Sequence, residues 1–224
     1  MIEFIKHWID IILHADRTLK LLVVEYQDWT YLILFVIIFC ETGLVITPFL
    51  PGDSLLFAAG TIASGLGVLN IYSLAGILLL AAFAGDNSNY FIGRFIGPKV
   101  FGMNLRYIRK DYLERTHAFY QKHGGKTVII ARFVPIIRTF APFVAGVGTM
   151  TYRRFILFSI AGSMLWINTF LWVGFLLGTN GFIQTHFTLV TIFIIIISLL
   201  PAFGAAAKAR LAGRRRISTE AGEK

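Results

Sequence analysis

The sequence predicts an all-α polytopic membrane protein in which a re-entrant helical hairpin followed by a transmembrane helix occurs twice, as an inverted repeat. Three observations lead to this fold class. Of the 224 residues, 56% are hydrophobic, and they gather into long uncharged runs such as residues 155–185. A helix needs about 20 apolar residues to cross a bilayer core of roughly 30 Å. Two other apolar segments contain both prolines and charged residues, and their motifs echo each other along the chain.

Charge is distributed unevenly, and this predicts the orientation of the chain. Residues 1–93 contain 3 Lys and Arg and 8 Asp and Glu residues, whereas residues 94–224 contain 18 and 4. Because cytoplasmic loops are enriched in Lys and Arg, the basic tail over residues 208–224 is expected in the cytoplasm, against anionic lipid headgroups. Basic residues that flank apolar spans argue against a nucleic-acid-binding protein. The single cysteine, Cys40, excludes an internal disulfide.

The first half contains an interfacial helix, a hairpin and a span. Residues 1–28 mix charged residues into an apolar pattern with helical spacing, which predicts an amphipathic helix on the membrane surface and not a cleavable signal. Residues 29–64 form the first predicted hairpin, interrupted around Pro48 and Pro51. The first span follows at residues 71–97. The side of the N-terminus stays open, because residues 29–47 either turn back or cross.

The second half follows the same plan. Residues 98–126 are predicted to form a basic cytoplasmic loop with an amphipathic helix. The apolar residues 127–150 then have a cytoplasmic segment at each end, so a straight span cannot connect them. A re-entrant hairpin broken near Pro135 and Pro142 can do so, provided that its freed backbone groups are buried in protein or hydrated. A span at 155–178 and a C-terminal span at 186–207 complete the prediction.

Short motifs recur in the same order in the two halves, which predicts the inverted repeat. The paired motifs are Phe49-Leu50-Pro51 with Phe133-Val134-Pro135, Ala59-Gly60 with Ala145-Gly146, Ala84-Gly85 with Ala161-Gly162, and Gly93-x-x-x-Gly97 with Gly174-x-x-x-Gly178. In transporters of this plan the site lies where the broken helices meet.

Four charged residues fall within the two hairpins: Glu41, Asp53, Arg132 and Arg138. Charges at membrane depth cost roughly 2.5–3.5 kcal/mol each and mark function by default. Two guanidinium groups beside a helix break suit a phosphate. Glu41 has apolar neighbours, which favour an uncharged carboxyl group, so we expect it to take up and release a proton. Asp53 is expected to hold an arginine until the ligand arrives. The alternative is that acids and arginines only lock the hairpins together.

Further residues are candidates for the lining of the same cavity: Asp86 and Asn89 beside Gly85, and the two prolines Pro51 and Pro135 at the breaks. For Asp86 and Asn89, a helix end near the water interface is an equal alternative. The sequence contains no phosphate-binding Walker loop, no His-Glu-x-x-His zinc motif and no Gly-x-Ser-x-Gly nucleophile motif. We therefore expect no enzyme activity, no cofactor and no metal site.

Several motifs in order resemble the DedA family, within the VTT domain superfamily, over nearly the whole chain. They are Phe39-Cys40-Glu41-Thr42-Gly43, Pro48-Phe49-Leu50-Pro51-Gly52-Asp53-Ser54-Leu55-Leu56, Gly85-Asp86-x-x-Asn89-Tyr90-x-x-Gly93-Arg94, and Ala131-Arg132-Phe133-Val134-Pro135-Ile136-x-Arg138-Thr139-Phe140-Ala141-Pro142. The resemblance implies a multi-pass bacterial inner-membrane protein with paired re-entrant loops. It also implies that the acids at positions 41 and 53 and the arginines at positions 132 and 138 are essential, and that some relatives translocate undecaprenyl phosphate.

The leading hypothesis is therefore a flippase that returns a polyprenyl-phosphate lipid to the inner leaflet, with Arg132 and Arg138 binding the phosphate and Glu41 or Asp53 coupling protons. The expected partners are membrane lipids and protons, with self-association as a homo-oligomer left open. One alternative is a proton-coupled transporter of a small solute or ion that maintains the proton motive force. Another is a non-transporting membrane scaffold that docks partners through its basic loop.

Overall fold

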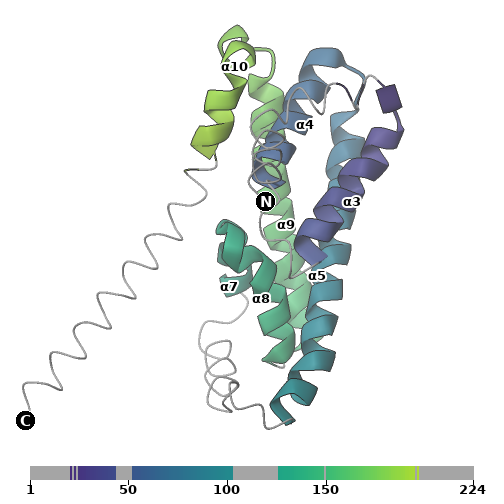
Figure 1. Cartoon of the computed structure of the whole chain (residues 1–224), viewed down its shortest axis with the longest axis vertical. Helices are drawn as coiled ribbons and strands as arrows, with labels where there is room; N and C mark the ends of the chain where they lie inside the picture. Colours follow the sequence, from purple (N-terminus) through teal and green to yellow (C-terminus); the bar gives the residue numbers. More distant parts are fainter. Residues whose placement is uncertain are drawn as a thin grey trace, which may run out of the picture.

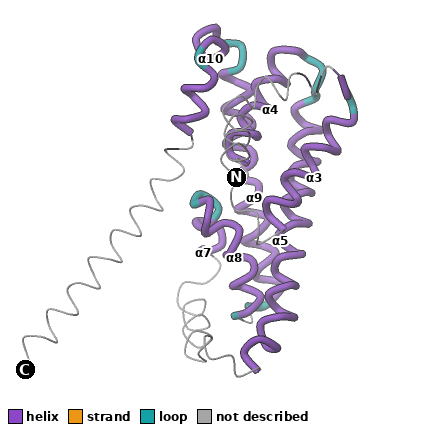
Figure 2. Tube along the Cα trace, in the orientation of Figure 1, coloured by secondary structure: helices purple, strands orange, loops and turns teal. Residues whose placement is uncertain are grey.

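The computed structural model (Figure 1) describes residues 21, 23, 25–43, 52–102, 126–148, 150–194 and 196. Within these ranges the chain forms helices joined by turns and loops and contains no strand (Figure 2), which confirms the predicted all-α class. The helices are α3 (Trp29–Gly43), α4 (Gly52–Leu66), α5 (Ile71–Gly102), α7 (Lys126–Ala131), α8 (Pro135–Val147), α9 (Tyr152–Leu177) and α10 (Gly181–Thr185).

The long helices α5 and α9 pack against each other and run in opposite directions (Figure 1). Ile71–Ile96 within α5 and Tyr152–Leu177 of α9 are both 26 residues long and apolar enough to cross a membrane. At 1.5 Å per residue each measures about 39 Å, more than the roughly 30 Å of a bilayer core. They coincide with the spans predicted at 71–97 and 155–178, although α5 continues to Gly102.

A break separates α7 from α8 where the sequence predicts one. The N–H groups of Arg132, Phe133 and Val134 donate to carbonyls three residues earlier, at 3.2, 3.2 and 3.1 Å, so the α-helical pattern ends there. Pro135 then begins α8, a position where its missing N–H removes no helical hydrogen bond. The other proline of this segment, Pro142, lies inside α8 without ending it.

Helix α4 packs along α9, and glycines bring the two backbones close together. A Cβ atom on Gly60 of α4 would collide with the carbonyl oxygen of Leu171, and one on Gly174 of α9 would collide with that of Phe57. The same spacing occurs on both helices: Gly60 follows Phe57 by three residues on α4, and Gly174 follows Leu171 by three residues on α9. Larger side chains at these two positions would therefore push the helices apart.

Helix α8 packs along α5 in the same way. A Cβ atom on Gly146 of α8 would collide with the carbonyl oxygen of Tyr90, and one on Gly93 of α5 would collide with that of Phe143. The three-residue spacing is again present on both helices. The short helices of the two halves are thus exchanged, because each packs on the long helix of the other half.

Some predicted elements lie wholly or partly outside the described residues. These are most of the interfacial helix at 1–28, the centre of the first hairpin at 44–51, and residues 103–125 of the basic loop. Of the C-terminal span predicted at 186–207, residues 187–194 and 196 are helical. The rest of that span and the tail at 208–224 lie outside the described residues.

Candidate functional site

Arg138 of α8 lies at the centre of a buried group of charged and aromatic side chains. Its Nη1 atom donates to Oδ1 of Asp53 at 2.7 Å, and its Nη2 atom donates to Oε1 of Glu41. The guanidinium carbon lies 4.4 Å from the ring centroid of Trp166, close enough for a cation–π interaction. The indole Nε1 of Trp166 also donates to Asp53, at 2.8 Å. Arg138 is thus held by residues of α3, α4 and α9.

Glu41 lies in the last turn of α3 and also contacts the start of α4. Its Oε1 atom accepts a hydrogen bond from the backbone N–H of Gly52 at 3.1 Å. A Cβ atom at position 52 would collide with the carboxylate of Glu41, so only glycine lets the two elements approach this closely. The second carboxylate oxygen, Oε2, is buried and has no hydrogen-bond partner. One oxygen of Glu41 therefore remains able to bind a proton or a donor group.

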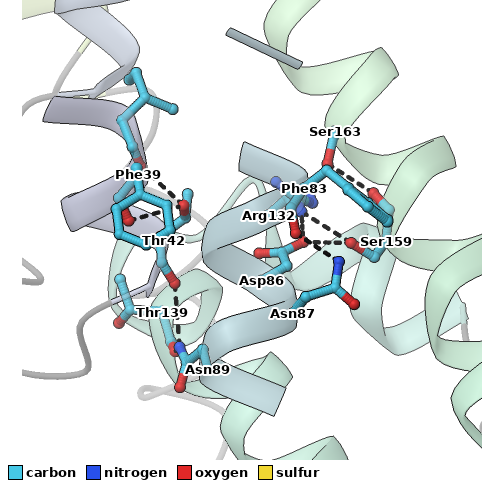
Figure 3. A network of polar contacts seen from close by, with 11 residues as sticks. Phe39, Thr42, Phe83, Asp86, Asn87, Asn89, Arg132, Thr139, Ser159 and Ser163 are labelled. Carbon is cyan, nitrogen blue, oxygen red and sulfur yellow. Dashed lines mark hydrogen bonds and ion pairs between the residues drawn. The ribbon is translucent and has the colours of Figure 1, made fainter. Parts of the chain in front are cut away.

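Arg132 belongs to a second group and lies in the break between α7 and α8, before the helix that carries Arg138. Its Nη2 atom pairs with Oδ2 of Asp86 on α5, and the hydroxyl group of Ser159 on α9 donates to the same oxygen. Figure 3 shows Arg132 reaching between these two long helices. The Nε and Nη1 atoms of Arg132 are buried without a partner. Arg132 thus keeps two unused donors inside the protein, an arrangement that normally calls for an acceptor.

Asn89 of α5 connects α3 and α8 near these charges. Its Nδ2 atom donates to the carbonyl oxygen of Thr42 at 3.2 Å and to that of Thr139 at 2.6 Å (Figure 3). Thr42 lies near the end of α3 and Thr139 lies in α8. One fully buried amide therefore satisfies backbone groups of both α3 and α8, which fixes the positions of these two helices relative to α5.

The buried charges do not balance. Among the buried side chains that the structure describes there are three carboxylates, Glu41, Asp53 and Asp86, and two guanidinium groups, Arg132 and Arg138. With all five ionised, the interior carries one uncompensated negative charge. Burying an ion costs several kcal/mol even when it is paired, so the excess of one carboxylate favours binding of a proton or a cation.

The four residues that the sequence predicts as one site do meet inside the protein, but in two groups. Glu41 and Asp53 both bind Arg138, whereas Arg132 binds Asp86. Asp86 is 1% exposed and lies inside α5, so the alternative of a helix end near the water interface is wrong. Asp86 and Asn89, which are predicted to line a cavity, both form bonds within the protein, and their position in a cavity lining stays a prediction.

The structure says little about Pro51 and Pro135, the two prolines predicted to line the cavity. Pro135 begins α8, next to Arg132, and nothing is described of its side chain. Pro51 lies outside the described residues. Their predicted contribution to a binding cavity remains a prediction.

Sequence reasoning missed Ser159 and Trp166, which complete the two groups. Both lie on α9, within the apolar span predicted at 155–178. The residues at positions 159, 162, 163 and 166 are serine, glycine, serine and tryptophan, and all four are buried. Their spacing places them on one face of a helix, and this stripe of small and polar residues is the signal that identifies the buried face. No group of three or more His, Cys, Asp or Glu side chains within the described ranges could hold a metal ion.

Comparison with known proteins identifies relatives over most of the chain. The family model described as the VTT domain matches residues 50–176, a range that contains Asp53, Asp86, Arg132 and Arg138 but not Glu41. Protein DedA of Escherichia coli K12 is 52% identical over 201 residues, which cover 89% of this chain and 92% of that protein.

Two further relatives are more distant. The uncharacterized membrane protein Rv0364 of Mycobacterium tuberculosis H37Rv is 43% identical over 81% of this chain and 80% of its own length. The inner membrane protein YqjA of Escherichia coli K12 is 33% identical over 79% and 80%, respectively. No solved structure matches the chain significantly.

Proposed function

This chain belongs to the DedA family of VTT-domain membrane proteins, and we propose that it is a flippase that carries a polyprenyl phosphate, undecaprenyl phosphate in bacteria, between membrane leaflets. One observation carries the proposal. Arg132, in the break between α7 and α8, and Arg138 of α8 both lie in the protein interior, where they are 3% and 4% exposed. Buried guanidinium groups beside freed backbone are the chemistry expected of a phosphate site at membrane depth.

The carboxylates that now hold the arginines support a role in ligand exchange. Arg138 binds Glu41 and Asp53 through two different nitrogen atoms, which is the two-point geometry that a phosphate also offers. Arg132 has two donors free for a further acceptor. A phosphate group would bind the free donors of Arg132 and replace the carboxylates on Arg138, leaving Glu41 and Asp53 to bind a proton or separate from the arginine.

The proposal includes re-entrant hairpins arranged as an inverted repeat. The exchanged packing of α4 on α9 and of α8 on α5 supports such a repeat, because the same glycine spacing occurs at both crossings. Transporters built from inverted repeats move one repeat against the other around a fixed central site. The hairpins would then open the site to one leaflet and afterwards to the other, while the lipid chain stays in the bilayer.

Proton coupling is the second part of the proposal. The excess of one carboxylate among the buried described charges supports a bound proton when no phosphate is present, and the unpartnered Oε2 atom of Glu41 supports Glu41 as its site. Phosphate binding adds negative charge and would favour protonation of a nearby acid. The activity would need no enzyme chemistry, cofactor or metal.

Localisation in the bacterial inner membrane, with the C-terminus in the cytoplasm, completes the proposal. The name of the related YqjA of Escherichia coli as an inner membrane protein supports the location. The basic residues between 208 and 216 support the orientation, because cytoplasmic tails are enriched in Lys and Arg.

The test is reconstitution of the full chain into liposomes that contain a labelled polyprenyl phosphate or a labelled phospholipid. We expect the polyprenyl phosphate to move between leaflets faster than in protein-free liposomes, and faster again with a proton gradient. Failure of both lipids to move would overturn the proposal. Uptake of a small anion without lipid movement would favour a solute transporter instead.

A further inference from the structure

A groove lies between α5 and α9 on the outside of the helix pair. Its volume is about 760 Å³, within the range of roughly 300–1,000 Å³ usual for small-molecule sites. Its main lining residues are Ser73, Gly76, Leu80, Phe83, Ser163 and Met164. Gly76, Leu80 and Met164 are exposed, so the groove is open along its length. An apolar groove on the outer face of two membrane-spanning helices faces hydrocarbon.

One end of this groove reaches the Arg132 group. Phe83 lies one turn before Asp86 on α5, and the hydroxyl group of Ser163 donates to the carbonyl oxygen of Ser159 at 2.8 Å. Figure 3 shows Phe83 and Ser163 beside Arg132, Asp86 and Ser159. The apolar groove therefore ends next to the two unpartnered donors of Arg132. A positively charged group at the end of an apolar groove complements a molecule with an anionic head and a hydrocarbon chain.

The length of the groove matches the depth of one membrane leaflet. Phe83 lies ten positions after Ser73 on α5, and at 1.5 Å for each step the two residues are about 15 Å apart along the helix. This is about half of a bilayer core of roughly 30 Å. Asp86 lies near the middle of the apolar segment Ile71–Ile96. The groove thus runs from the centre of the span toward its Ile71 end, the depth of a single leaflet.

We propose that the groove between α5 and α9 holds the hydrocarbon chain of a phosphate lipid while Arg132 binds its headgroup. This inference rests on the proposed flippase function. It adds where the hydrocarbon chain lies and which arginine binds the phosphate. Asp86 and Ser159 contact the Nη2 atom of Arg132, and the phosphate binds at its free Nε and Nη1 atoms. The bound lipid has its phosphate near mid-membrane and its chain in one leaflet, as required part-way through translocation.

Gly76 offers a direct test, because a Cβ atom added there meets nothing within 4 Å. Gly76→Trp therefore adds a large side chain to the groove from a Cβ position with open surroundings. Gly65→Trp is the matched control, since Gly65 of α4 is exposed, has equally open surroundings and lies outside the groove. The probes are a polyprenyl phosphate with a photoreactive diazirine in its chain and the matching polyprenol without phosphate. Both are added to the full-length protein in liposomes, and labelled residues are identified by mass spectrometry.

We expect the phosphate probe to label groove residues and unlabelled polyprenyl phosphate to compete with it. Gly76→Trp should reduce this labelling at least about tenfold, which corresponds to about 1.4 kcal/mol of binding, while Gly65→Trp should leave it unchanged. The polyprenol should label the groove no more than the exposed residues Leu32 and Val36 of α3.

Equal labelling by both probes would overturn the role of Arg132, and unchanged labelling of Gly76→Trp would overturn the groove as the chain site. Lipid movement by the wild type distinguishes a failure of the groove inference from a failure of the flippase proposal. If the wild type moves lipid and Gly76→Trp does so equally fast, the groove inference fails while the flippase proposal stands. If the wild type moves no lipid, the flippase proposal fails, and the labelling pattern alone decides whether the groove binds a phosphate lipid.

Discussion

At the scale of single residues, the geometry around Arg138 requires a guanidinium group and not only a positive charge. Two separate nitrogen atoms bind Asp53 and Glu41, and the planar group lies over the ring of Trp166. Lysine has a single nitrogen and no plane to stack. We expect Arg138→Lys to reduce lipid movement in liposomes at least about tenfold, a loss of about 1.4 kcal/mol.

The matched control for this variant is Arg153→Lys, because Arg153 is exposed at the start of α9. It should retain wild-type transport. If Arg138→Lys also moved lipid at the wild-type rate, two-point binding by Arg138 would have no part in the activity.

The buried ion pair between Arg132 and Asp86 leads to a prediction about thermal stability. Both side chains are almost fully buried, and removal of one partner of such a pair typically costs about 3–5 kcal/mol because the other charge is left uncompensated. Asp86→Asn should therefore lower the Tm of the detergent-solubilised protein strongly. The double variant Asp86→Asn with Arg132→Gln should recover part of that loss, since no unpaired buried charge remains.

Thermal unfolding of the two single variants and the double variant gives the coupling between the residues. Ser159→Ala is the milder comparison, because it removes one hydrogen bond to Asp86 and leaves the charge pair intact. Additive losses in the double variant would mean that the two side chains do not depend on each other.

The charges of the site could be predicted from the sequence, but their partners could not. Glu41, Asp53, Arg132 and Arg138 are recognisable because a charge within an apolar segment is costly and needs a reason. The pairing of Arg132 with Asp86 depends on which faces of α5 and α9 meet the hairpin, 46 residues along the chain. Trp166 looks like any aromatic residue of an apolar span until its neighbours in space are known.

At the scale of helices, the close glycine contacts between α4 and α9 and between α8 and α5 lead to parallel predictions. Gly93→Val and Gly174→Val would each force a side chain against the backbone of a short helix, at Phe143 and Phe57 respectively. A backbone cannot move aside as a flexible side chain can, so we expect each variant to lose at least about 1–3 kcal/mol, the usual cost of overpacking. Thermal unfolding in detergent measures the loss.

Gly65→Ala is the control for these variants, because its Cβ atom meets nothing within 4 Å. It should not lower Tm, since alanine favours a helix over glycine by about 1 kcal/mol. A wild-type Tm for either valine variant would show that the two helices in contact there can move apart without loss of stability. Destabilisation at only one crossing would argue against equivalent roles for the two halves.

Helix boundaries were predictable where proline chemistry determines them. The break before Pro135 follows from its missing N–H group and from the restriction that it places on the preceding residue. Pro142 has the same chemistry but lies inside α8, because a membrane protein can satisfy freed backbone groups through packed neighbours. The exchange of α4 and α8 between the two long helices could not be predicted, because a glycine motif indicates close approach but not the partner.

At the scale of the whole molecule, the two halves contribute opposite charges to the interior. The buried acids Glu41, Asp53 and Asp86 all precede residue 102, and the buried arginines Arg132 and Arg138 both follow residue 126. Each half alone would bury charges of one sign without partners. Association of the halves and assembly of the site are therefore one event, and any movement between the halves must separate or exchange these charge pairs.

The excess negative charge of the assembled interior leads to the last prediction, which concerns proton coupling. In Glu41→Gln the side-chain oxygen can still accept hydrogen bonds from Gly52 and Arg138, but the amide cannot bind and release a proton. We expect this variant to equilibrate lipid between leaflets without a gradient, while the ratio of its rates with and without a proton gradient falls to unity.

Glu25→Gln, which changes an exposed glutamate, should keep the gradient response of the wild type. Liposome assays at imposed pH differences measure both ratios. A full gradient response in Glu41→Gln would assign proton coupling to another acid, and Asp53 and Asp86 are then the two remaining buried carboxylates among the described residues. Loss of all movement, even without a gradient, would instead mean that the charge of Glu41 is needed to position Arg138, and the site would then depend on all of its ion pairs to stay assembled.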